Sequence, residues 1–241
     1  MTKRLAIGGL ILWLLSQGCN VYGETDSSAE YLPLVDGNSW TYRVTGTDGT
    51  YNETMTVLPG TTVINGVATK AVQYSDGDID YFTSDTNGIR YHRSYDATPP
   101  PIITFTFNPP LLYAHEKLSI PDTIYSSGIV SVMHETAGTF PLNYAATSEI
   151  KSLETVLVPA GTYETVRISD LTNMNGKFQG DTIDYSEWGD TWLAKHIGVI
   201  KKTFYDNDGG AEEWVMISTN VKPPVEEKRG TYLPFLPLLL D

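Results

Sequence analysis

The amino-acid sequence predicts an all-β protein, mainly antiparallel and arranged as a meander, with at most one or two short helices. Apolar and polar residues alternate in many short segments, as in the run Trp40, Tyr42 and Val44, and this period is typical of half-buried strands. Asn-Gly and Asp-Gly pairs, which supply the positive φ angles of tight hairpin turns, occur repeatedly. The chain also contains 15 tyrosines, 7 phenylalanines and 5 tryptophans, a composition that favours sheets.

The N-terminal segment, residues 1–18, is typical of a signal peptide. Lys3 and Arg4 precede an apolar run over residues 5–15, which is shorter than the ~20 residues of a membrane-spanning helix. The segment ends in Leu-Leu-Ser-Gln-Gly before Cys19, the only cysteine, and this resembles the bacterial lipoprotein box. The resemblance identifies Cys19 as a lipidation site that binds the protein to a membrane. The alternatives are an ordinary secretory peptide or a short buried helix.

The sequence divides into a signal peptide (1–18), a lipidated tether (19–30), one antiparallel β domain (31–222), and a linker with an apolar C-terminal tail (223–241). Without residues 1–18, the remaining 14 basic and 29 acidic residues give a net charge of −15. Such a charge repels nucleic acid and anionic headgroups, so we expect no nucleic-acid partner. The tail, with its two prolines, either docks on the domain or presents an apolar ligand to a partner.

Alternation and turn signals predict each strand in turn. Six pairs predict hairpin turns: Asp48-Gly49, Asn65-Gly66, Asp76-Gly77, Asn87-Gly88, Asn175-Gly176 and Asp208-Gly209. Strands are predicted over residues 40–45, 51–57, 63–64, 67–74, 81–82, 89–95, 103–107, 129–136, 152–158, 163–168, 183–188, 191–194, 199–205 and 213–218. Asn108-Pro109-Pro110 is expected to end a strand, and residues 111–127 to form a long loop that caps a cavity or plugs the sheet. A short helix could lie within residues 143–153.

No catalytic constellation emerges from the residue pattern. His134-Glu135 begins like a zinc-protease motif, but Gly138 occupies the position of the second ligand. Acidic residues alternate at 76, 78 and 80, as in calcium-binding turns, without the complete calcium loop. No nucleophile elbow or phosphate-binding loop is present. We therefore expect a protein that is not an enzyme, without catalytic residues, metal ligands or cofactors.

Aromatic side chains on predicted strands are the candidate ligand-binding residues. If the sheet curls around a cavity, these rings would line it and could bind an acyl chain or another apolar molecule. The alternative is an ordinary packed core. The candidates are Trp40, Tyr42, Phe105, Phe107, Trp188 and Trp192.

Three motifs together resemble a family of bacterial envelope lipoproteins, the TapB-like proteins. The motifs are the opening Tyr31-x-Pro-Leu-x-x-Gly-Asn-x-Trp-x-Tyr42, the segment Val-Pro-Ala-Gly-Thr at 158–162, and Trp-x-Ala-Lys-x-x-Gly-x-x-Lys at 192–201. The resemblance covers most of residues 31–205. It implies a curved sheet or half-barrel, loosely like that of envelope lipoprotein carriers.

The leading hypothesis is a non-enzymatic bacterial envelope lipoprotein, anchored through lipid on Cys19, whose curved sheet binds an apolar small molecule or an envelope protein. In lipoproteins an Asp after the cysteine favours inner-membrane retention, and Asn20 stands there, so we expect the outer membrane, facing the periplasm. The alternatives are an assembly factor that acts through the apolar tail, and a hydrolase with dispersed carboxylates.

Overall fold

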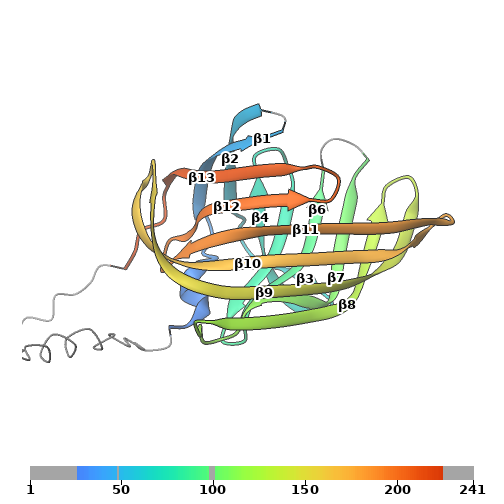
Figure 1. Ribbon diagram of the computed structural model, residues 1–241, viewed down its shortest axis with the longest axis horizontal. Helices are drawn as coiled ribbons and strands as arrows, with labels where there is room; N and C mark the ends of the chain where they lie inside the picture. The colour runs from blue at the N-terminus through green and yellow to red at the C-terminus, as the bar shows by residue number, and fades with distance from the viewer. Residues whose placement is uncertain (1–25, 48, 98–100, 225–241) are drawn as a thin grey trace, which may run out of the picture.

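The computed structural model describes residues 26–47, 49–97 and 101–224 (Figure 1). One four-residue 3-10 helix, η1 (Ser28–Tyr31), is followed by strands only, which confirms the all-β antiparallel prediction. The strands are β1 (Ser39–Gly46), β2 (Gly49–Val57), β3 (Thr62–Ile64), β4 (Val67–Tyr74), β5 (Ile79–Asp85), β6 (Gly88–Asp96), β7 (Ile103–Ala114), β8 (Asp122–His134), β9 (Gly138–Val158), β10 (Gly161–Phe178), β11 (Asp181–Ala194), β12 (Gly198–Asp206) and β13 (Ala211–Thr219).

The sheet closes on itself, so the predicted open curved meander or half-barrel is wrong. β1 pairs with β2 on one side and with β13 on the other, and β2 pairs with β4 through residues 55–57. Every strand except β3 therefore belongs to one ring of twelve strands. Closure removes the unpaired backbone groups that the edges of an open sheet would expose. Turn signals reveal only neighbouring strands, whereas closure joins residues as distant in sequence as Trp40 and Thr219.

The predicted loop over residues 111–127 is also wrong, because β7 continues to Ala114 and β8 begins at Asp122. Asn108-Pro109-Pro110 does not end the strand. In the pairing with β6, Thr106 is followed by Leu111, and the pairing with β8 stops at Asn108, so both prolines lie where no ladder donor is needed. The region 143–153 holds no helix and lies inside β9.

Four of the six predicted Gly-containing turns connect strands as expected, a fifth includes Asp48, which lies outside the described residues, and the sixth does not form. Asn175-Gly176 lies within β10, and the chain reverses at Gln179 and Gly180, both of which have positive φ. Gly176 is needed in the strand for a different reason. A Cβ there would lie 2.6 Å from Cδ2 of Leu142 on the neighbouring strand β9, so a close side-chain approach occupies its place.

One end of the barrel is closed and the other is open. The closed end carries η1 and the connections at residues 115–121, 159–160 and 195–197, at the left in Figure 1. Two apolar clusters fill it, one around Trp40 and Ile200 and the other around Tyr31 and Ile150. The open end carries the turns at residues 75–78, 135–137 and 207–210. A third cluster, around Phe107 and Tyr144, fills the space under the long strands β8–β11.

The described part of the expected tether, residues 26–30, packs against the closed end. The Ser28 amide donates to the Glu116 carbonyl at 2.8 Å, and the Lys195 ammonium pairs with Asp26 at 2.6 Å. Within the described ranges, no helix has the length and apolar character needed to cross a bilayer. The signal peptide, Cys19 and the tail beyond Pro224 lie outside the described residues.

Candidate functional site

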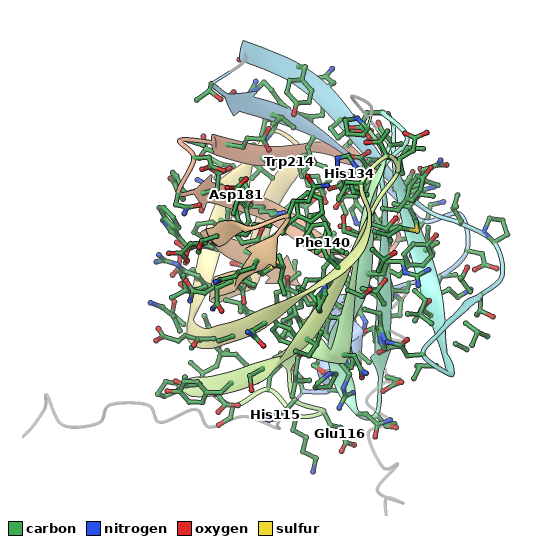
Figure 2. All side chains as sticks on the ribbon, turned by 90° about the vertical axis from the view of Figure 1, so that its right-hand side faces the viewer. His115, Glu116, His134, Phe140, Asp181 and Trp214 are labelled. Carbon is green, nitrogen blue, oxygen red and sulfur yellow. The ribbon has the colours of Figure 1, made fainter. Side chains whose placement is uncertain are left out.

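The space that the apolar clusters leave free is a cavity of about 490 Å³ inside the barrel. Its floor is formed by residues of the closed end, among them Leu32 and Trp40, and its upper wall by Asp76 and Glu212 beside the turns of the open end. This volume is in the usual range for small-molecule sites. Figure 2 shows the molecule from the open end, where the strands surround the interior and Trp214 is labelled on the cavity wall.

The cavity wall is strongly acidic. Eight acidic side chains line it but only one basic side chain, Lys202 on β12. The acids come from strands and turns all around the ring: Glu53, Asp76, Asp78, Asp80, Asp96, Asp170, Glu187 and Glu212. Side chains of a strand point alternately into and out of the barrel, so every second residue of a strand faces the interior. Polar residues at those positions therefore face the interior.

The deepest carboxylates accept hydrogen bonds from uncharged partners. Asp80 accepts from the hydroxyls of Tyr74 and Tyr91, each at 2.7 Å. Asp170 accepts from the Ser148 hydroxyl at 2.6 Å across the β9–β10 pair. Neutral donors hold these oxygens in place without compensating their charge.

The remaining acids of the wall differ in how fully they are hydrogen-bonded. Glu53 accepts from the Ser75 amide at 2.5 Å, and Glu212 accepts from the Trp214 indole at 2.8 Å. Glu187 accepts no hydrogen bond from any described residue. Leaving Asp76 and Asp78 aside, none of these acids forms an ion pair with a cation of the described chain.

Burial shifts the pKa of the inner acids upward. Burial raises the pKa of Asp170 to about 7, although the Ser148 hydrogen bond and the charge of Lys202 act in the opposite direction. Burial, together with the neighbouring acids Asp80 and Asp96, also raises the pKa of Glu187. At neutral pH Asp170 is therefore close to the midpoint of its titration, and carboxyl groups with raised pKa values are frequent in functional sites.

Aromatic rings occupy the wall between the acids. Trp214 makes edge contacts with Tyr42 and Tyr74, with centroid distances of 5.7 and 6.0 Å. The ring centroids of Tyr91 and Tyr113 lie 6.3 Å apart. The Lys202 ammonium lies 5.8 Å from the Trp214 ring centroid and 5.7 Å from that of Phe204. A positive charge is thus already held against aromatic faces inside this cavity.

Half of the predicted ligand-binding aromatics contribute to the cavity lining, and they do so in different ways. Trp40 and Tyr42 lie in its floor and wall, where Trp40 donates to the Ile197 carbonyl at 2.6 Å and Tyr42 to the Val199 carbonyl at 2.9 Å. Trp188 touches the cavity. Its ring is 43 % exposed, however, and stacks on the exposed Tyr205.

The other three predicted residues lie elsewhere. Phe105 and Phe107 belong to the apolar cluster under the long strands. Trp192 lies on the outer face, where Arg167 and Lys201 lie 5.3 and 5.2 Å from its ring. The structure therefore does not bring the six aromatics together as one site.

The acids of the cavity are the residues that sequence reasoning missed. The alternating acids at 76, 78 and 80 were visible but fit solvated turns equally well. Ile168 and Leu193 are buried in the closed end, which shows which faces of β10 and β11 point inward. Asp170 and Glu187 lie on those same faces. Polar residues in phase with core residues were the available signal. No local pattern tells whether that face meets a void.

The acids are spread around the wall rather than gathered at a point. Within the described ranges, no three or more His, Cys, Asp or Glu side chains are placed to hold a metal ion. Gly189, between Glu187 and Thr191, lets β11 and β12 approach closely, since a Cβ there would lie 2.0 Å from the Thr203 carbonyl oxygen. Among the described residues, the cavity wall therefore offers separated carboxylates rather than a converging set of ligands for a single ion.

The three motifs that resemble TapB-like lipoproteins meet at the closed end instead of in the cavity. Trp40, Val158, Ala194 and Ile197 belong to one apolar cluster, with Ala160 packed against it. The motifs thus build the floor of the barrel. The TapB-like grouping itself stays a prediction.

A protein-family model matches part of the chain. The model of the DUF3108-like family matches residues 117–212, from the loop before β8 to the second residue of β13 and less than half of the chain. No curated protein sequence matches the chain significantly.

Three solved structures resemble this one at low sequence identity. A candidate lipoprotein from Parabacteroides distasonis is 12 % identical, covering 80 % of this chain and 99 % of that one, with a TM-score of 0.46. A candidate exported protein with a YmcC-like fold from Bacteroides fragilis is 14 % identical, with 78 and 98 % covered and a TM-score of 0.47. The hypothetical lipoprotein YmcC from Escherichia coli is 9 % identical, with 79 and 86 % covered and a TM-score of 0.42.

Proposed function

We propose that this chain is a bacterial envelope lipoprotein, anchored through lipid on Cys19, whose closed barrel binds a small molecule in its internal cavity without transforming it. The observation that carries the proposal is the cavity of about 490 Å³, walled by carboxylates and aromatic rings. Burying so many acids without a cation costs stability, and such costs are typical of functional sites. The acids on the wall favour a ligand that carries polar or charged groups, in place of the purely apolar ligand expected from the sequence.

The placement of the chain ends supports access from the aqueous side. Asp26 pairs with Lys195 in the connection between β11 and β12, so the first described residue lies at the closed end. Cys19 precedes Asp26 by seven residues, which span at most ~25 Å. A lipid at Cys19 would attach the closed end to the membrane, and the open end would face away from it. The outer membrane, facing the periplasm, is the proposed location.

Native mass spectrometry of the lipidated protein, isolated from its own envelope, tests the ligand. We expect a bound mass in the wild type that is lost when Thr191→Trp, on the cavity wall, fills the space. Thr182→Trp on the exposed face of the same strand is the matched control and should keep the bound mass. A wild type that is always empty, or a bound mass that persists in a folded Thr191→Trp variant, would overturn the proposal.

The anchor is tested separately by metabolic labelling with palmitate. Cys19→Ala should abolish incorporation and release the protein from the membrane fraction. A variant that remains equally membrane-bound would contradict lipid anchoring while leaving the cavity proposal intact.

A hydrolase is the second candidate, because Asp170 has a pKa of about 7 and lies near the acid Glu187. A carboxyl group that is half protonated at neutral pH can serve as a general acid, with a second carboxylate as base or nucleophile. Turnover of aryl glycosides that Asp170→Asn abolishes would support this candidate. A lack of turnover across such substrates by the folded wild type would leave the binding function as the proposal.

A further inference from the structure

The charge of the cavity identifies the class of ligand that it fits. Its wall carries eight acids against one lysine, and six of those acids form no ion pair with the described chain. Carboxylates facing a shared interior repel one another and raise the potential energy of any anion that enters. A ligand with positive charge removes that repulsion. The six are Glu53, Asp80, Asp96, Asp170, Glu187 and Glu212.

Two polar groups of the cavity lining have no hydrogen-bond partner within the described chain. The hydroxyl of the half-buried Tyr113 forms no hydrogen bond with a described residue, and burial raises its pKa well above the usual range. The Glu187 carboxylate also accepts no hydrogen bond. Both groups line the cavity and keep their hydrogen-bonding capacity for a molecule that enters it.

The aromatic rings match the same ligand. Tyr74, Tyr91 and Trp214 stand between the acids, and ring faces attract cations in partly desolvated sites. The Lys202 ammonium shows this contact within the chain itself, because it lies against the Trp214 and Phe204 rings without an ion pair. A metal ion is a poorer match, since no three ligating groups converge among the described residues.

We infer that the cavity binds a small organic cation, an amine or quaternary ammonium compound, between its carboxylates and its aromatic rings. This inference rests on the proposed function, that the cavity holds a small molecule. Glu187 and the Tyr113 hydroxyl face the cationic group, and Lys202 opposes it by charge. Both a diamine and a quaternary ammonium carry the shared chemistry of positive charge on an apolar frame.

Isothermal titration of the full-length lipidated protein in detergent tests the inference with four probes. Putrescine and tetramethylammonium are the cations, glucose is the neutral probe, and citrate is the anion. We expect heat of binding with at least one cation and none with citrate. Binding of putrescine but not tetramethylammonium would show that hydrogen-bond donors are required, and the reverse order would show that the rings dominate; both results support the inference.

Two variants locate the binding in the cavity. Glu187→Gln should weaken cation binding about tenfold, whereas Lys202→Met, which removes the opposing charge, should tighten it about threefold. Glu213→Gln is the matched control, because Glu213 on β13 pairs with Lys201 and lies outside the cavity lining. If Glu187→Gln does not fold, the tighter cation binding expected of Lys202→Met still tests the inference. Weakened cation binding in Lys202→Met would overturn the inference.

Proton release gives a readout that binding to the outer surface would not produce. The groups around Asp170 are Lys202 on β12, Glu187 and Asp190 on β11, and Tyr113 on β7. A cation entering among them favours the ionised carboxyl, so titration at pH 7 in two buffers should show protons released on binding. Binding without proton release, or with protons taken up, would contradict a site beside Asp170.

Failure of this inference is distinguishable from failure of the proposed function. If glucose binds, Thr191→Trp abolishes that binding and neither cation gives heat of binding, the cavity holds a small molecule of another class. If no probe binds and native mass spectrometry finds the wild type empty, the inference and the proposed function are both overturned.

Discussion

The closed end and the cavity are built by the same strands under opposite rules. At the closed end, the indole of Trp40 and the hydroxyl of Tyr42 each donate to a backbone carbonyl, and apolar side chains fill the remaining space. In the cavity, by contrast, Glu187 on β11 and the Tyr113 hydroxyl on β7 have no hydrogen-bond partner among the described residues. The packed floor therefore stabilises the fold, whereas the carboxylates of the cavity above it carry an electrostatic cost.

This difference indicates a division of roles within one barrel. A ring of twelve strands is too wide for side chains alone to fill along its whole length. Dense packing at one end fixes the strand register, and the other end can then carry polar groups that a packed core would not tolerate.

The largest expected effect is the loss of the floor. Trp40→Ala removes a side chain that is 2 % exposed together with its hydrogen bond to Ile197, and should lower the free energy of unfolding by about 3–5 kcal/mol. Urea denaturation measures it. Trp188→Ala, on a ring that is 43 % exposed, is the control and should cost under about 1 kcal/mol. Equal losses in the two variants would remove the contrast.

Neutralising an acid of the cavity should do the opposite and stabilise the fold. The pKa of Asp170 is about 7 in the folded protein, whereas an unfolded Asp has a pKa of about 3.9. Between these values the folded state keeps a proton that the unfolded state has released, so its stability falls as pH rises through this window. Asp170→Asn should therefore be about 2 kcal/mol more stable than the wild type at pH 8, without this gain at pH 4.

Thermal unfolding at the two pH values measures this effect, and Asp190 provides the contrast. Burial acts to raise the pKa of Asp190, but the hydrogen bonds from Arg167 (2.8 Å) and Ser169 hold it below the usual value. Asp190→Asn should lower stability at pH 7 by roughly 1 kcal/mol, and the loss should fade as pH falls through that pKa. A stabilised Asp190→Asn, or a destabilised Asp170→Asn at pH 8, contradicts the assignment.

A smaller effect is expected where the N-terminal segment meets the floor. Lys195 pairs with Asp26 at 2.6 Å and Glu30 at 3.2 Å, both around η1. Lys195→Met should cost about 0.5–1 kcal/mol and speed hydrogen exchange in η1. Lys151→Met, which removes a pair with Glu149, should leave that exchange unchanged. Unchanged exchange in both variants would show that η1 is held by apolar packing alone.

The smallest effect concerns a single hydrogen bond in the cavity. Ser148→Ala removes the donor to Asp170, so the carboxyl loses a partner that favours its ionised form. The pKa of Asp170 should rise further above 7, as measured by carbon NMR of the carboxyl group. Ser169→Ala acts on Asp190 instead and should leave Asp170 unchanged. A lowered pKa in Ser148→Ala would show that the hydroxyl does not donate.

Strand positions and hairpins were largely predictable because their signals are local. The turns at Asn65-Gly66 and Asn87-Gly88 fall where their positive φ angles are required. Errors occurred where a tertiary contact overrode a local signal. Pro109 and Pro110 continue β7 because a bulge removes the need for their amides, and Gly176 lies within a strand beside Leu142. Neither contact can be read from residues close in sequence.

The candidate site was predictable only in outline. Aromatic alternation placed Trp40 and Tyr42 at the cavity, but the same pattern also selected Trp192, which lies on the outer face because its neighbours Thr191 and Leu193 point inward. The sequence pattern of the cavity carboxylates fits solvent-exposed turn residues equally well, so they were not predicted as site residues. A polar residue at an inward position signals a site only once the space opposite it is known to be empty.

The sequence by itself determined the strands, most of the turns and the excess of acids, because period, turn chemistry and charge are properties of neighbouring residues. The tertiary structure decided that β1 joins β13 and β2 joins β4, and that Asp80, Asp170 and Glu187 therefore share one chamber. The physical reason is that closure is a long-range pairing, set by the twist and length of the whole ring. The potential inside that ring depends on charges that meet only when it closes.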